Sequence, residues 1–304
     1  MALLEARWTD PEMPPHPGAN VHPRLSIGIL LMFVAHSSPI QAQTADDPPT
    51  ADALANVVLS DAHTFVLRDP ETQIPYRLYV ALPPGYANDS SRYPVLYMLD
   101  ADAGFALATQ AYRLLRVDST MPDLLLVGIG YDLSGAARRS QRNRHLTPTR
   151  IESDSATGES AAFLKSLVEM IIPAIDSRYR TDPGDRSIFG HSLGGLFVLY
   201  ALLERPEVFH RYIASSPSLW WDNGVLLRIE SQFARHERSL PKRIFMSVGA
   251  EEAADMHERF RPFADSLMSR RYRGLELTAV VLPDETHLSA FATAFGRGVR
   301  TIYR

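Results

Sequence analysis

Two kinds of hydrophobic pattern alternate along residues 53–304. Short apolar and β-branched runs occur at 64–68, 76–83, 94–100, 123–130, 186–190, 211–215, 243–249 and 275–283. The middle runs are apolar on both faces, as expected for parallel strands that are covered on both sides. Longer segments with helical spacing lie at 158–179, 194–204, 225–237, 256–272 and 289–303.

This alternation predicts an α/β fold with a doubly wound, mostly parallel central sheet and helices on both faces. No helical segment separates the first apolar runs, so we expect antiparallel strands at the front of the sheet. No linker, repeat or low-complexity tract interrupts residues 53–304. The pattern therefore predicts a single domain.

Residues 1–50 are predicted to be an N-terminal extension to this domain. The apolar segment 25–35 follows Arg24 and leads into small and polar residues around Ala42. This organisation is typical of a secretory signal peptide, here at about 21–42, and the core is too short to span a bilayer comfortably. A buried helix is the alternative. The acidic, proline-rich residues before the segment fit an export signal poorly and favour a translation start near Val21.

A cleaved signal would give a periplasmic or secreted protein without a stable membrane anchor; without a signal, we expect a cytoplasmic protein. The net charge is −4 and no Lys/Arg-rich run is present, so nothing indicates a nucleic-acid partner. The chain has no cysteine, which excludes disulfides, thiolate metal sites and cysteine nucleophiles. The sequence does not indicate an oligomeric state.

A candidate nucleophile lies between a predicted strand and a predicted helix. Residues 190–194 read GHSLG and fit the G-x-S-x-G pattern, with Ser192 at its centre. In this context the pattern predicts a nucleophile elbow, whose glycines allow a sharp turn. The amide of Leu193 would then be the first oxyanion donor. The alternative is a glycine-rich turn with a capping serine.

A serine hydroxyl needs a base, and that base is predicted to be His287. Three other histidines follow Ser192, but they lie among charged or helical residues: His210, His236 and His257. His287 instead falls between the last strand and the last helix, from where it can reach over the sheet edge. The histidine needs a carboxylate, and the segment after 243–249 offers Glu251, Glu252 and Asp255. We favour Glu252, with the other two left open.

The segment that follows 94–100 is predicted to be a loop that supplies the second oxyanion donor, the amide of Ala101 or Asp102. Its D-A-D-A-G spacing suggests a calcium loop, but the later ligand positions are Gly104 and Ala111. We therefore predict no metal and no cofactor.

Three further residues are candidates for substrate binding. Arg144 lies in a predicted loop with four arginines that could hold an acidic or catecholate substrate, or could simply be a solvated loop. Trp220 and Trp221 could wall an aromatic or acyl pocket, and core packing explains at least one of them equally well.

The residues quoted above, together with the segments at 93–105, 142–149, 163–221 and 284–291, resemble the family known as putative esterase. This family includes the enterochelin and other ferric-siderophore esterases and is related to S-formylglutathione hydrolases and mycolyltransferases. The resemblance extends over residues 64–303. It implies an α/β-hydrolase fold, Ser192 as nucleophile and His287 as base.

The family glutamate in a VG-x-x-E stretch corresponds to Glu252. Two positions depart from the family pattern. Ala101 stands where many members have the glycine of LDG, a change that preserves the amide donor. His145 stands where many have the aspartate of RDYTP, which puts substrate recognition by that segment in doubt.

Together these features predict a serine hydrolase that cleaves a small-molecule carboxylic ester, with a periplasmic siderophore trilactone esterase as the sharper hypothesis. Two alternatives remain open. One is acyl transfer to an alcohol by the same fold, and the other is a non-catalytic ligand-binding relative.

Overall fold

The computed structural model describes residues 7–9, 58–118 and 121–304. The predicted signal segment at 21–42 and the rest of the predicted extension beyond residues 7–9 lie outside the described residues. Residues 59–304 belong to one compact unit.

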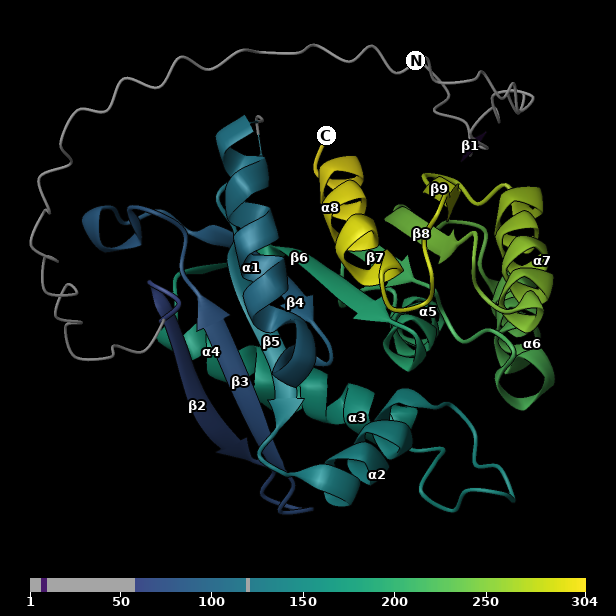
Figure 1. The fold of residues 1–304 in the computed structure, drawn as a ribbon, viewed down its shortest axis with the longest axis horizontal. Helices are drawn as coiled ribbons and strands as arrows, with labels where there is room; N and C mark the ends of the chain where they lie inside the picture. The colour runs from purple at the N-terminus through teal and green to yellow at the C-terminus, as the bar shows by residue number, and fades with distance from the viewer. Residues whose placement is uncertain (1–6, 10–57, 119–120) are drawn as a thin grey trace, which may run out of the picture. The chain divides into compact units, whose positions relative to one another are not determined.

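A mostly parallel sheet forms the centre of this unit (Figure 1). Its strand order is β1-β9-β8-β7-β6-β4-β5-β3-β2. The strands are β1 (Arg7–Thr9), β2 (Ala62–Arg68), β3 (Pro75–Ala81), β4 (Tyr93–Met98), β5 (Leu125–Tyr131), β6 (Thr181–His191), β7 (Arg211–Ser215), β8 (Arg243–Gly249) and β9 (Glu276–Leu282). β3 runs antiparallel to both β2 and β5, whereas the other pairs are parallel. The expected antiparallel strands at the front of a mostly parallel sheet are thus confirmed.

Helices cover both faces of the sheet, as the alternation predicted. One face packs against α1 (Ala101–Asp118) and α8 (Ala290–Ile302). The other packs against α3 (Ser160–Ser166), a π-helical segment η2 (Leu167–Ile171), α4 (Ile172–Arg178), α5 (Leu193–Glu204), α6 (Trp221–His236) and α7 (Ala254–Arg270). A short 3-10 helix, η1 (Tyr86–Asn88), precedes β4, and α2 (Gly135–Leu146) follows β5. Among the described residues, no helix combines the length and apolarity needed to cross a membrane.

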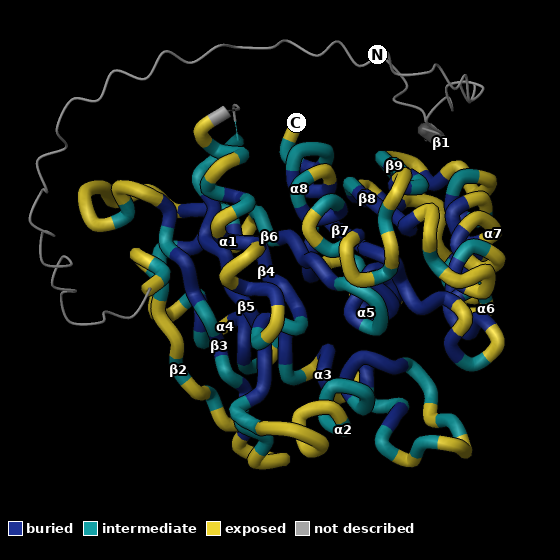
Figure 2. The backbone as a smooth tube through the Cα atoms, in the orientation of Figure 1, coloured by how far each residue is buried: buried dark blue, intermediate teal, exposed yellow. Residues whose placement is uncertain are grey.

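Each central strand contributes to two hydrophobic cores. On β4, Val95 and Tyr97 belong to the core beneath α3–α7, and Leu96 and Met98 belong to the core beneath α1 and α8. Figure 2 shows these strands buried along their length. Because side chains alternate between the two faces of a strand, a run that is apolar at every position can fill both cores.

Two predicted loops are helices in the structure, which corrects the sequence interpretation. The segment after β4 begins α1 at Ala101, and the arginine-rich segment after β5 is α2. The inward face of α1 combines small residues, Gly104 and Ala108, with the large Phe105 and Tyr112, while Leu114 and Val117 are exposed. Small residues inside and large apolar residues outside weaken the contrast between the two faces by which an amphipathic helix is recognised in a sequence.

The parallel strands all end at one edge of the sheet. The turns after β4, β6, β7, β8 and β9 therefore converge there, which is where open α/β sheets bind their ligands. β6 lies between β4 and β7, so the turn that it forms with α5 is at the middle of this edge.

Candidate active site

Ser192 occupies a strained turn between β6 and α5. Its backbone angles are φ 61° and ψ −122°, a conformation that residues with a side chain rarely adopt. Hydrogen bonds fix the turn: the Ser192 amide donates to the Ser215 carbonyl at 2.9 Å, and its carbonyl accepts from the amides of Leu196 and Ser218. These bonds hold the serine at the sheet edge.

Gly190 of the motif and Gly195, which follows the motif, allow α5 to approach β6 and β7 closely. A Cβ atom on Gly190 would lie 2.2 Å from the carbonyl oxygen of Gly194, and one on Gly195 would lie 2.9 Å from the carbonyl oxygen of Ser215. Both contacts are too short for a real Cβ atom. The turn therefore requires glycine at these two positions.

Glu252 and His287 are hydrogen-bonded to each other beside this turn. The Glu252 Oε2 atom lies 2.7 Å from His287 Nδ1, and the glutamate side chain is fully buried. Its other oxygen accepts from the Ser216 hydroxyl and from the Gly249 amide at 2.7 Å. Burial alone would raise the pKa of Glu252, but the hydrogen bonds from His287, Ser216 and Gly249 outweigh it and lower that pKa. The carboxylate is thus ionised at neutral pH.

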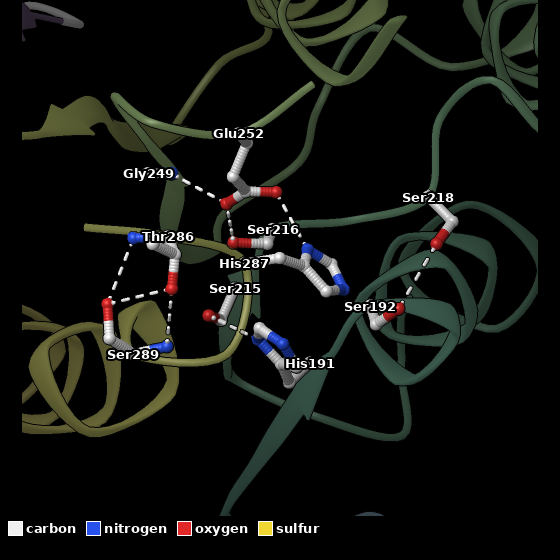
Figure 3. Close-up of polar contacts among 10 residues, drawn as sticks. All are labelled: His191, Ser192, Ser215, Ser216, Ser218, Gly249, Glu252, Thr286, His287 and Ser289. Carbon is white, nitrogen blue, oxygen red and sulfur yellow. Dashed lines mark hydrogen bonds and ion pairs between the residues drawn. The ribbon is translucent and has the colours of Figure 1, made fainter.

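Figure 3 shows the His287 ring between Glu252 and Ser192, with the second ring nitrogen facing the serine. The histidine lies in the loop between β9 and α8, where Thr286 and Ser289 hydrogen-bond to each other. The Ser192 hydroxyl oxygen is 3.4 Å from that of Ser218. The structure thus groups Ser192, His287 and Glu252, whereas Glu251 and Asp255 are exposed.

His191 is a second imidazole beside His287. The two ring centroids are 4.7 Å apart, and His191 Nδ1 lies 2.9 Å from the Ser215 hydroxyl. Burial, together with the neighbouring His287, lowers the pKa of His191 to about 4. His191 is therefore neutral near pH 7 and adds no positive charge beside His287.

Leu193 and Ala101 are the first residues of two helices, α5 and α1. The amides in the first turn of a helix have no partner within it, and the helix dipole favours negative charge there. The amides of Leu193 and Ala101 are therefore suited to donate hydrogen bonds to an oxyanion.

A cavity of about 890 Å³ opens beside the turn, between α1, α2 and the start of α8. It borders His191 and Leu288, the chain neighbours of Ser192 and His287. Its lining has an apolar side, formed by Leu107, Leu288 and Phe291, and a cationic side, formed by Arg138 and Arg139. Arg142 also lines the cavity, but it is paired with Asp100, and Asp100 and Asp102 line the cavity too. An ester held there would meet both kinds of surface.

The three predicted substrate-binding residues do not line this cavity. Arg144 pairs with Glu159 at 2.9 Å. Trp221 is buried and donates its indole N–H to the Thr149 carbonyl at 3.2 Å, whereas Trp220 is 40% exposed. Their role in substrate binding stays a prediction.

Sequence reasoning overlooked Ser216, which holds Glu252, and it named Arg144 alone among the four arginines of α2. Arg138 and Arg142 are four residues apart, the spacing of one helix face, and this signal becomes visible once α2 is known to be helical. In the described part of the chain, no group of three or more His, Asp or Glu side chains could hold a metal ion. Asp102, predicted not to bind calcium, accepts from the Tyr79 hydroxyl and the Tyr131 amide.

Known proteins are similar to this chain in sequence or in fold. The family described as Putative esterase matches residues 70–265. Ferri-bacillibactin esterase BesA of Bacillus subtilis is 30% identical over 226 residues, which are 68% of this chain and 78% of BesA. The siderophore triacetylfusarinine C esterase of Aspergillus fumigatus is 31% identical over 196 residues, 60% of this chain and 66% of that protein. The crystal structure of an IroE-like serine hydrolase from Shewanella oneidensis superposes with a TM-score of 0.72 at 26% identity and covers 80% of each chain.

Proposed function

This chain belongs to the Putative esterase family and is a carboxylic ester hydrolase, and on that basis we propose that it cleaves its substrate through an acyl-enzyme on Ser192. The observation that carries the proposal is the hydrogen bond between the buried Glu252 carboxylate and His287, beside a serine with a φ of 61°. This arrangement has the parts of a nucleophile, a base and a group that orients the base.

In the proposed reaction, His287 takes the proton of Ser192 while the serine oxygen attacks the ester carbonyl. Glu252 stabilises the imidazolium ion that forms. The amides of Leu193 and Ala101 bind the oxyanion, and His287 then protonates the leaving alcohol. Water repeats these steps on the acyl-enzyme, releases the acid and returns the proton to Ser192.

We further propose that the ester belongs to a siderophore. Two relatives are named for siderophore esters, one for ferri-bacillibactin and one for triacetylfusarinine C. The cavity beside the turn is large, at about 890 Å³, and the cationic side formed by α2 suits a bulky ligand that carries negative charge.

Labelling with a fluorophosphonate tests the nucleophile. We expect the wild-type protein to carry the label on the peptide that contains Ser192, and Ser192→Ala to carry none. Ser218→Ala is the matched control, because Ser218 places the neighbouring hydroxyl only 3.4 Å away, and this variant should still be labelled. Label on Ser218, or none in the wild type, would refute the acyl-enzyme.

A substrate panel tests the siderophore assignment. We expect ferri-bacillibactin or triacetylfusarinine C to be hydrolysed with a higher kcat/KM than short p-nitrophenyl esters, with products identified by mass. Turnover of the short esters alone would leave the esterase activity standing and remove the siderophore assignment.

A further inference from the structure

Asp100 forms the turn between β4 and α1, directly before the proposed oxyanion donor Ala101. Its φ is 56°, a left-handed conformation that is uncommon for a residue with a side chain. Its carbonyl accepts from the amides of Ala103 and Gly104, at 3.1 and 3.3 Å. The direction of the Ala101 amide therefore depends on how firmly Asp100 is held in this conformation.

Arg142 of α2 holds the Asp100 side chain by two parallel hydrogen bonds. The guanidinium Nε lies 2.6 Å from Oδ1, and Nη2 lies 2.7 Å from Oδ2. Both side chains are mostly buried, with 28% of Arg142 and 20% of Asp100 exposed. A planar fork on a carboxylate fixes orientation as well as distance, which the point charge of a lysine cannot do.

The same carboxylate lies against the start of α5. A Cβ atom on Gly194, the second residue of that helix, would be 3.4 Å from Asp100 Oδ2. An unpaired negative charge there would oppose the negative charge that develops on the substrate between the amides of Leu193 and Ala101. The Arg142 guanidinium cancels this charge.

We propose that Arg142 is a positioning residue for ester hydrolysis. It acts through Asp100, by fixing the turn that directs the Ala101 amide and by neutralising the carboxylate beside Ser192. This inference rests on the proposed function, because it requires an oxyanion to form at Ser192. It differs from substrate binding by the cationic side of the cavity, which would act on the ligand directly.

Kinetics with a small neutral ester, p-nitrophenyl acetate, test the proposal. We expect Arg142→Gln to lower kcat at least about tenfold, toward the roughly 100-fold loss seen when an oxyanion donor is removed, with KM within about twofold. The double variant Asp100→Asn/Arg142→Gln should regain part of the lost kcat. Asparagine tolerates a positive φ and carries no charge, so the unpaired carboxylate is gone.

Two results would overturn the proposal. A purely structural role would lower the melting temperature of Arg142→Gln and leave kcat per folded molecule unchanged. A substrate-binding role would raise KM, and Asp100→Asn would not reverse that change. If Arg142→Gln does not fold, Arg142→Lys keeps the charge without the fork; an unchanged kcat in this variant would exclude the orienting effect.

A matched control comes from a second ion pair, which joins Arg186 of β6 to Asp176 of α4. Arg186 lies 2.6 Å from Asp176, with 17% and 25% of the two side chains exposed, and it precedes His191 by five residues. Arg186→Gln removes this ion pair, so it should destabilise the fold and leave kcat unchanged.

Fluorophosphonate labelling separates the positioning role of Arg142 from the proposed acyl-enzyme on Ser192. If wild-type Ser192 is labelled and Arg142→Gln retains full kcat, only the positioning role fails; an unlabelled wild type removes the proposed function as well.

Discussion

The two oxygens of the Glu252 carboxylate have different hydrogen-bond partners. Oε2 pairs with the histidine, while Oε1 accepts from Ser216 and from the Gly249 amide. The second set of bonds fixes the plane of the carboxylate, and the first fixes the tautomer and orientation of the imidazole. Removing the charge while keeping the shape therefore separates the electrostatic contribution of Glu252 from its packing.

We expect Glu252→Gln to lower kcat by about 1,000- to 10,000-fold with little change in KM. The amide can still accept from Ser216 and Gly249, but its NH₂ group then faces His287 Nδ1 and favours the wrong tautomer. Steady-state hydrolysis of p-nitrophenyl acetate measures the effect. Glu251→Gln changes the exposed neighbour and should leave kcat unchanged. A loss of less than tenfold in Glu252→Gln would show that this carboxylate does not orient the base.

The role of a single residue could be predicted where a motif or a position between two predicted elements identifies it. Ser192 has a motif, and His287 lies in the loop between the last strand and the last helix. Ser216 could not be predicted, because its hydroxyl reaches Glu252 through a turn with a φ of 43°, which no motif in the sequence marks. Arg142 could not be distinguished from Arg144 until both were known to lie on a helix.

The contact between β6 and α5 is the most restrictive junction in the site. The Gly194 carbonyl oxygen occupies the space where a side chain on Gly190 would begin. A Cβ atom on Gly194 itself would meet only ordinary contacts, at 3.4 Å or more. Gly194 therefore has room for a side-chain Cβ atom, whereas Gly190 has none.

The expected result is that Gly190→Ala lowers the free energy of unfolding by about 3 kcal/mol, because helix and strand must move apart. Gly194→Ala should be neutral or slightly stabilising, since alanine favours a helix over glycine. Urea denaturation of both variants measures the difference. Equal effects at the two positions would contradict the close approach of α5 to β6.

Helices were predictable where their buried face is made of large residues. α5 and α8 were found because their buried positions include leucine, phenylalanine and valine. α2 was missed because nearly all of its residues are polar or small, and only His145 and Leu146 are buried. It is held against the fold by ion pairs and hydrogen bonds, including those of Arg142 and Arg144, which hydrophobic periodicity does not detect.

Across the whole molecule, the alternation of strands and helices was enough to predict the fold class and the antiparallel front strands. The strand order was not predicted, because it depends on which helix crosses to which face. Burial affects the whole molecule in two ways. It forms both hydrophobic cores, and it shifts the pKa of titratable side chains that are enclosed in them. His145 is one such group: it is 2% exposed, stacks on Phe163 and contacts the Tyr131 hydroxyl at 3.0 Å.

Buried histidines give the protein a predictable sensitivity to acid. Burial lowers the pKa of His145 to about 3 and that of His191 to about 4, whereas both protonate near pH 6.5 in the unfolded chain. Below about pH 6.5 the unfolded state binds protons that the folded state does not, so stability falls by about 1.4 kcal/mol per pH unit for each group. We expect His145→Gln to reduce the pH dependence of the free energy of unfolding by about 1.4 kcal/mol per pH unit between about pH 6.5 and pH 4.5, as measured by urea unfolding. His236→Gln, at an exposed histidine, should retain the wild-type slope. An unchanged slope in His145→Gln would mean that His145 takes up its proton in the folded protein as readily as in the unfolded chain.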